Sequence, residues 1–149
     1  MVDFKASLAQ GLEAAAKAEA SRSEIKAVFE TLNLQLAEAT GGKLFVERSE
    51  EIQMPNPLSG GIFGGLSQAL GNTRTVPIIR CINPLVKGKA EKLCEYSMGR
   101  AGYPFEIKID RQELVCHDRD SLEMALAEML SDPVIGEKIM RVMNAQEND

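Results

Sequence analysis

The stretch YPFEIKIDRQELVCHD, residues 103–118, decides the fold class. Its first half alternates apolar and charged side chains, and the apolar ones are Phe105, Ile107 and Ile109. Because side chains of a strand point alternately to opposite faces, this pattern predicts a strand over 103–110 with one buried face. After a short turn, ELVCHD predicts a second strand over 113–117. The two strands form a β-hairpin, which indicates an antiparallel sheet.

Two earlier segments extend this sheet. KLFVERSE alternates well enough to predict a strand over 43–50. TVPIIRCIN predicts a strand over 75–83, and it is apolar on both faces apart from Arg80, as expected of an interior strand. Pro77 lacks the N–H that a ladder needs, so we expect the first residues of this strand to lie at an edge or a bulge. The sheet should therefore contain about four strands.

Four segments are predicted to be helical. Residues 3–40 are rich in Ala, Leu, Glu and Lys, lack proline and end at two glycines. Residues 86–98 predict a middle helix, whose shared face comprises Val86, Ala90, Leu93, Cys94 and Ser97. Capping residues that include Asp118, and a proline at a first helical position, Pro133, predict two C-terminal helices, over 119–130 and 133–143. We expect an α+β fold: one domain over 1–149, in which these helices pack a small, mainly antiparallel sheet.

The long N-terminal helix carries a heptad-like seam. Its seam residues are Phe4, Leu8, Gly11, Ala15, Ala18, Arg22, Ile25, Phe29, Leu32 and Leu36. The alternative is two helices broken near residue 21, because Ser21 and Glu24 have the spacing of a capping box. The seam either covers the protein's own sheet, or its first half projects and pairs with a second copy or another partner. A homo-oligomer through this helix therefore stays open.

A glycine-rich loop is predicted between the first two strands, over 54–74. Residues 54–72, MPNPLSGGIFGGLSQALGN, contain no charge, and their large apolar side chains include Leu58, Ile62, Phe63, Leu66 and Leu70. The loop matches neither nucleotide-binding glycine motif. It is an ordered loop with a short helix, a mobile lid or a docking surface for another protein, since loops of this length are usually functional or disordered.

Charge is distributed unevenly along the chain. Residues 72–111 contain eight basic and four acidic residues, whereas the remainder contains nine basic and eighteen acidic ones. A basic segment can bind an anion or nucleic acid, or pair with the protein's own acidic side chains. The candidate anion-binding residues are Arg74, Arg80, Lys87, Lys89, Lys92, Arg100 and Lys108. For Arg80, an internal partner such as Glu47 or Glu106 is the preferred interpretation.

Catalytic and metal-binding motifs are few. His117 is the single histidine, which excludes a two-histidine metal site within one chain. The three cysteines lie 13 and 22 residues apart, too far for the close ligand pairs of structural zinc sites. A nucleophilic pair of His117 with Cys81 or Cys94 is formally open, although buried, reduced thiols are the simpler interpretation. We expect no catalytic residues, no metal and no cofactor.

Three functional hypotheses follow. The chain has neither a signal-peptide pattern nor an apolar run long enough to span a bilayer, so we expect a soluble, cytoplasmic protein. The first hypothesis is a non-enzymatic interaction module, such as an inhibitor, immunity-like, chaperone-like or accessory protein. It would bind another protein through the glycine-rich loop, through Phe4 and Leu8 of the N-terminal helix, or through both. The second is a nucleic-acid-binding or anion-binding accessory protein, and the third is a small enzyme with a Cys-based centre.

Overall fold

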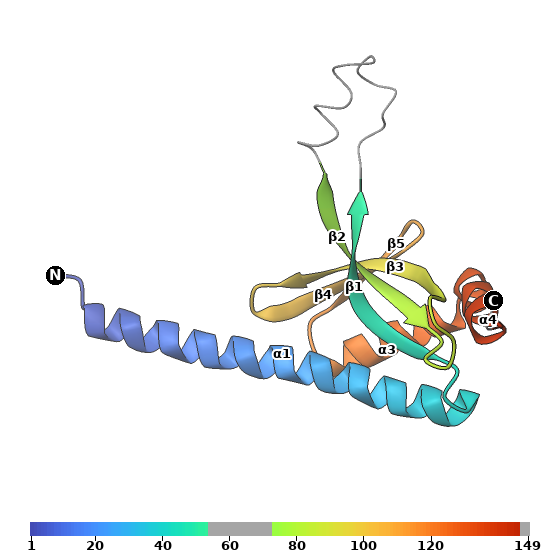
Figure 1. Ribbon diagram of the computed structural model, residues 1–149. Coiled ribbons are helices and arrows are strands. Elements are labelled where there is room, and N and C mark those ends of the chain that lie inside the picture. Colours follow the sequence, from blue (N-terminus) through green and yellow to red (C-terminus); the bar gives the residue numbers. More distant parts are fainter. Residues whose placement is uncertain (54–72, 147–149) are drawn as a thin grey trace, which may run out of the picture.

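The computed structural model describes residues 1–53 and 73–146, which form a five-stranded antiparallel sheet and three helices (Figure 1). The strands are β1 (Phe45–Gln53), β2 (Arg74–Ile82), β3 (Ala90–Gly99), β4 (Gly102–Ile109) and β5 (Gln112–Cys116). Each strand pairs with the next one along the chain. The helices are α1 (Phe4–Thr40), α3 (Arg119–Ser131) and α4 (Pro133–Met143). The α+β class with a long N-terminal helix is confirmed, with one strand more and one helix fewer than expected among the described residues.

The predicted hairpin is present as β4 and β5. Phe105 pairs with Cys116, and Ile107 pairs with Leu114, so the alternating apolar side chains share one face of the sheet. The pairing of β2 with β3 covers only residues 78–82 of β2. Pro77 lies just beyond this ladder, which confirms that the start of β2 is an edge toward β3.

The prediction of a helix over 86–98 is wrong. Residues 83–89 connect two strands, and β3 follows from Ala90. Ile79 pairs with Cys94 whereas Arg80 pairs with Lys92, so Leu93 is an extra residue in the ladder. This bulge buries both Leu93 and Cys94, which are neighbours in sequence. Two adjacent buried residues break the period of two, and their spacing therefore resembles one face of a helix.

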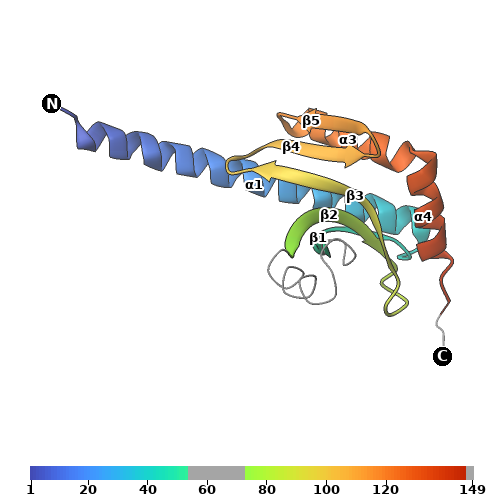
Figure 2. The same ribbon diagram turned by 90° about the horizontal axis from the view of Figure 1, so that it is seen from above.

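All three helices contribute to one core on the same face of the sheet (Figures 1 and 2). The fully buried side chains of this core include Ile25, Ile79, Phe105, Ile107, Leu122, Met129 and Ile135. The opposite face of the sheet carries polar side chains, among them Glu47, Arg80, Lys92, Glu95 and Glu106. No helix within residues 1–53 and 73–146 is long and apolar enough to cross a membrane.

Helix α1 is continuous over 37 residues, so the alternative of a break near residue 21 is wrong. It ends at Gly41, which takes the left-handed conformation at φ 65°. In its second half Ile25 and Phe29 are buried, as the seam predicts. The side chain of Asn33 also completes the free edge of β1: it donates to the carbonyl of Val46 and accepts from the Val46 N–H, both at 2.8 Å.

Contact between α1 and the sheet begins near residue 21. Gly102, with φ 94°, opens β4 directly beneath the helix, and an added Cβ there would lie 2.9 Å from the Cβ of Ser21. Arg22 donates from Nη1 to the carbonyl of Arg100 at 2.7 Å. The hydroxyl of Tyr103 donates to Oε1 of Glu24, also at 2.7 Å. These contacts hold the middle of α1 on the β3–β4 turn.

Candidate partner-binding helix and basic segment

The N-terminal part of α1 projects away from the rest of the protein (Figures 1 and 2). Every residue from Phe4 to Lys17, here called the α1 arm, is exposed. The arm begins at Asp3, whose side chain accepts hydrogen bonds from the N–H groups of Lys5 and Ala6 at 3.1 and 3.2 Å. Alanine is its commonest residue, and alanine has the highest helix propensity. The capping residue and the helix propensity of the arm therefore support its helical conformation without packing against the sheet.

Three large apolar side chains are displayed on the arm. Phe4, Leu8 and Leu12 are 78%, 63% and 62% exposed. They are spaced four residues apart, so they lie along one side of the helix. Phe4 and Leu8 belong to the predicted partner-binding set, whereas Leu12 was missed because it lies outside the seam. The spacing Phe4-Leu8-Leu12 was the signal that could have identified it.

The other predicted partner-binding residues lie outside the part of the chain that the structure describes. They are Leu58, Ile62, Phe63, Leu66 and Leu70. The three interpretations of the loop over 54–74 stay predictions, except that Arg74 itself begins β2. The α1 arm is accordingly the surface on which the interaction hypothesis can be examined structurally.

The basic segment is interleaved with acidic side chains on the polar face of the sheet. Nε of Arg80 lies 2.6 Å from Oε1 of Glu47, which is its cross-strand neighbour. This confirms an internal acidic partner for Arg80. Nζ of Lys108 lies 3.9 Å from Oε1 of Glu113 on the adjacent strand. Both cations therefore face carboxylates of the protein itself.

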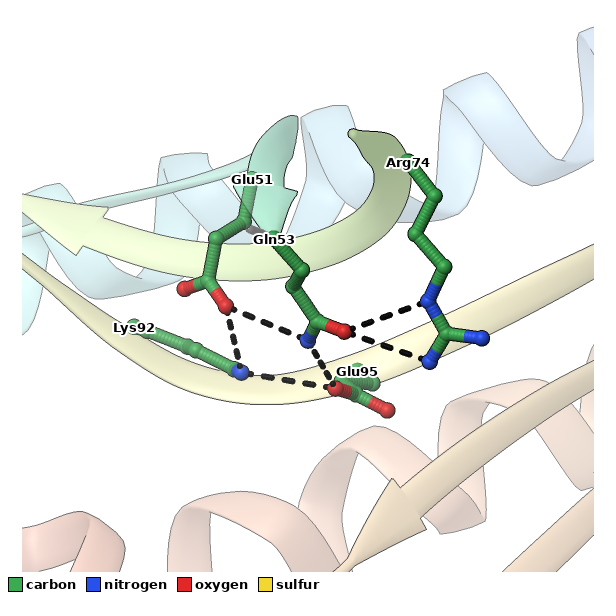
Figure 3. Close-up of polar contacts among 5 residues, drawn as sticks. All are labelled: Glu51, Gln53, Arg74, Lys92 and Glu95. Carbon is green, nitrogen blue, oxygen red and sulfur yellow. Dashed lines mark hydrogen bonds and ion pairs between the residues drawn. The ribbon is translucent and has the colours of Figure 1, made fainter. Parts of the chain in front are cut away.

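A five-residue network continues this pattern where β1 ends and β2 begins (Figure 3). Nζ of Lys92 lies 3.1 Å from Oε1 of Glu51 and 3.5 Å from Oε1 of Glu95. Gln53 donates to both carboxylates at 3.4 and 3.2 Å. Its own Oε1 accepts from Nε and Nη2 of Arg74, at 3.3 and 3.2 Å. The network joins the ends of β1 and β2 to β3.

Charges within this network stabilise one another. The hydrogen bond from Lys92 lowers the pKa of Glu51, and Gln53 lowers it further. Desolvation alone would lower the pKa of Lys92, but its contacts with Glu51 and Glu95 raise it overall. The network contains two cations, Lys92 and Arg74, and two carboxylates, Glu51 and Glu95, so its formal charges cancel and it leaves little positive potential for an outside anion.

The remaining basic candidates are exposed but separated. Lys87 and Lys89 lie in the connection before β3, whereas Arg100 lies in the turn after it. These positions are at opposite ends of a ten-residue strand, and a strand of that length spans roughly 30 Å. The structure therefore does not bring the seven basic candidates together on one surface.

The cysteine thiols are unsuited to nucleophilic catalysis. Cys81, Cys94 and Cys116 are free and buried, whereas His117 is exposed. Burial raises the pKa of Cys81 to about 11 and that of Cys94 to about 12. Burial also raises the pKa of Cys116. Sγ of Cys94 contacts Sδ of Met129 at 3.6 Å, which is a packing contact in the core. These features argue against the Cys-based centre.

A groove between α1 and α3 has a volume of about 300 Å³. Apolar side chains line much of it, including Val28, Leu32, Leu126 and Leu130, and its described lining contains one carboxylate, Glu123. A single carboxylate provides no partner for general acid and base chemistry. Within residues 1–53 and 73–146, no three His, Cys, Asp or Glu side chains are grouped so that they could hold a metal ion.

Comparison with known proteins gives no further guidance: no family model, curated protein or solved structure matches this chain.

Proposed function

We propose that this protein is a non-enzymatic interaction module, and that it binds a helical protein partner through the α1 arm. The observation that carries the proposal is the exposure of Phe4, Leu8 and Leu12 along one side of a helix that leaves its own sheet. Amphipathic helices recognise other helices by apolar residues at such i, i+4 spacing.

The energetics favour a paired arm over a bare one. An isolated helix shorter than about 12–15 residues is marginal in water, and most helices gain stability from packing an apolar face. Burying one Leu or Phe side chain fully contributes roughly 1.5–3 kcal/mol. Three such side chains supply roughly 5–9 kcal/mol, which is comparable to the lower estimates of about 4–15 kcal/mol lost on association. The difference is at most about 5 kcal/mol, so we expect a weak affinity, with a Kd of about 0.2 mM or above.

The charge distribution argues against the anion-binding alternative. Arg80, Lys92 and Lys108 lie against carboxylates, at separations of 2.6 to 3.9 Å. Binding a phosphate chain on this face would displace these carboxylates or place its charge beside them. Protein binding through the arm involves no such conflict between charges, because the side chains proposed to make the contact are apolar.

A matched pair of variants tests the proposal. Leu8→Asp places a charge in the apolar side of the arm, whereas Ala9→Asp places the same residue one position along, on another side of the helix. The wild-type chain should capture a partner from the native cell, Leu8→Asp should lose it and Ala9→Asp should keep it. Each captured protein would then be purified and tested for direct binding.

Two controls complete the experiment. Circular dichroism should show that both variants unfold at the temperature of the wild type, because the arm is exposed and projects away from the sheet. Equal capture by all three proteins would refute a role for the arm. Loss of binding in Ala9→Asp as well would show that arm helicity, and not its apolar side, is what matters.

A further inference from the structure

We infer that the partner of the α1 arm is the arm of a second copy of this chain, packed antiparallel and centred on Leu12. The inference rests on the proposed function and specifies its partner. It depends on the order of side-chain sizes and charges along the arm, which suits an antiparallel pair and opposes a parallel one.

Side-chain size changes from one end of the seam to the other. The large residues Phe4 and Leu8 come first, and the small residues Gly11, Ala15 and Ala18 follow. In an antiparallel pair centred on Leu12, Leu8 lies opposite Ala15 and Ala18 of the second copy. Leu8 therefore packs against small side chains in the facing helix, which allows close approach of the two backbones, and Leu12 is the residue that meets its own copy. In a parallel pair each residue would face its own copy. The large side chains would then pack against each other, and the small Gly and Ala residues would leave unfilled space between the helices.

Charges on the arm and on the helical turn that follows it have matching positions. Lys5 and Glu19 lie seven residues before and after Leu12, which is two helical turns in each direction. They therefore lie on the same side of the helix as Leu12. Antiparallel pairing brings Lys5 of each copy beside Glu19 of the other, which gives two symmetric ion pairs. A parallel pair would bring Lys5 near Lys5 instead. Neither residue belongs to an ion pair within residues 1–53 and 73–146.

The rest of the fold leaves room for this pairing. Contacts of α1 with the sheet begin near Ser21, C-terminal to the arm. In the antiparallel pair the two sheets lie at opposite ends, separated by an arm of roughly 25 Å. The shared surface is short, so the dimer should dissociate reversibly on dilution.

Charge reversal tests the register. In sedimentation velocity, the wild-type chain should pass from monomer to dimer between low and several hundred micromolar. Lys5→Glu places Glu beside Glu19 of the second copy, and Glu19→Lys places two lysines together, so each should weaken dimerisation about tenfold. The double variant restores opposite charges and should recover wild-type affinity to within about threefold.

Cysteine cross-linking tests the orientation. Leu12 meets Leu12 of the second copy at the twofold axis, so Leu12→Cys should form a disulfide-linked dimer under mild oxidation. Leu8→Cys should cross-link far more slowly, because in this arrangement the two Leu8 positions lie more than one helical turn apart. The native thiols are buried and should not compete. Equal cross-linking of both variants would indicate a parallel pair and overturn the inference.

The outcomes separate this inference from the proposed function. A wild-type chain that stays monomeric throughout overturns the second-copy inference, as does a dimer insensitive to both charge reversals. If the monomer still captures a different protein that Leu8→Asp releases, the proposed function stands with another partner. If the chain stays monomeric and Leu8→Asp releases nothing, both are overturned.

Discussion

The hydrogen bonds between Asn33 and the free edge of β1 provide a sharp test of how α1 is held on the sheet. The carbonyl and N–H of Val46 both bond the Asn33 side chain at 2.8 Å. Val46 is only 1% exposed, so water has little access to these backbone groups. The perturbation is Asn33→Ala, which removes both partners and leaves the backbone of β1 in place.

The expected loss of stability follows from these contacts. Leaving one buried donor or acceptor without a partner costs about 1–3 kcal/mol, so two such groups predict a loss of about 2–4 kcal/mol once some relaxation is allowed. Alanine is the better helix former, by about 0.5 kcal/mol, which offsets a small part of this loss. A small protein has a total stability of about 5–15 kcal/mol, so the change should be easy to measure.

Urea denaturation followed by circular dichroism is the assay. With a slope of about 1–3 kcal/mol per molar urea, the midpoint should fall by about 1–2 M at unchanged slope. Thr31→Ala is the control, because Thr31 is exposed on the same helix and also gains helix propensity. A change of less than about 0.5 kcal/mol in Asn33→Ala would refute the argument, since it would mean that water replaces both bonds.

Three further predictions concern the turn, the thiols and a helix cap. Gly102→Ala should destabilise the fold by about 1–3 kcal/mol through strain at positive φ and contact with α1, whereas Gly136→Ala, with open space around it, should be neutral or stabilising in urea titrations. Cys81 and Cys94 should react with a thiol reagent at neutral pH only on unfolding; fast labelling of the native protein would contradict their burial. Hydrogen bonds from the helix terminus it caps lower the pKa of Asp118 below 3.8. Its stabilising effect should therefore be present above that pH and be lost as the pH falls further, and Asp118→Asn should remove this part of the acid dependence.

Local patterns in the sequence predicted much of the fold. The alternation of Phe105, Ile107 and Ile109 predicted β4, and the capping pattern at Asp118 is present as a capping box at the start of α3. Such features depend on residues close together in the chain, so they are readable from sequence. The end of β1 was less predictable. That strand continues to Gln53, three residues beyond the prediction, where its side chains join a network with β2 and β3.

Strand β3 shows where local reading fails. A bulge at Leu93 depends on the neighbouring strand, and it buries two adjacent residues. The resulting pattern imitates a helical face, although the first half of β3 pairs with β2 and its second half pairs with β4. Strand pairing is a long-range interaction, and it overrides a short local pattern.

The candidate site was also predictable only in part from the sequence. Phe4 and Leu8 could be selected from periodicity, but their exposure depends on where α1 leaves the sheet. Leu12 was overlooked because a seam ranks residues by heptad position and not by solvent exposure. The basic residues formed a plausible anion site in sequence. An acidic partner was predicted for Arg80 alone, and only the tertiary structure showed that Lys92 also faces carboxylates.

The sequence by itself determined the class of the protein: an antiparallel sheet, a long N-terminal helix with a strong second half, and few catalytic options. Tertiary structure decided which half of that helix is core. Ile25 and Phe29 are buried against the sheet, while Phe4 and Leu8 extend beyond it. The reason is physical: helix propensity and periodicity are local, whereas burial depends on the distant strands that meet each turn of the helix.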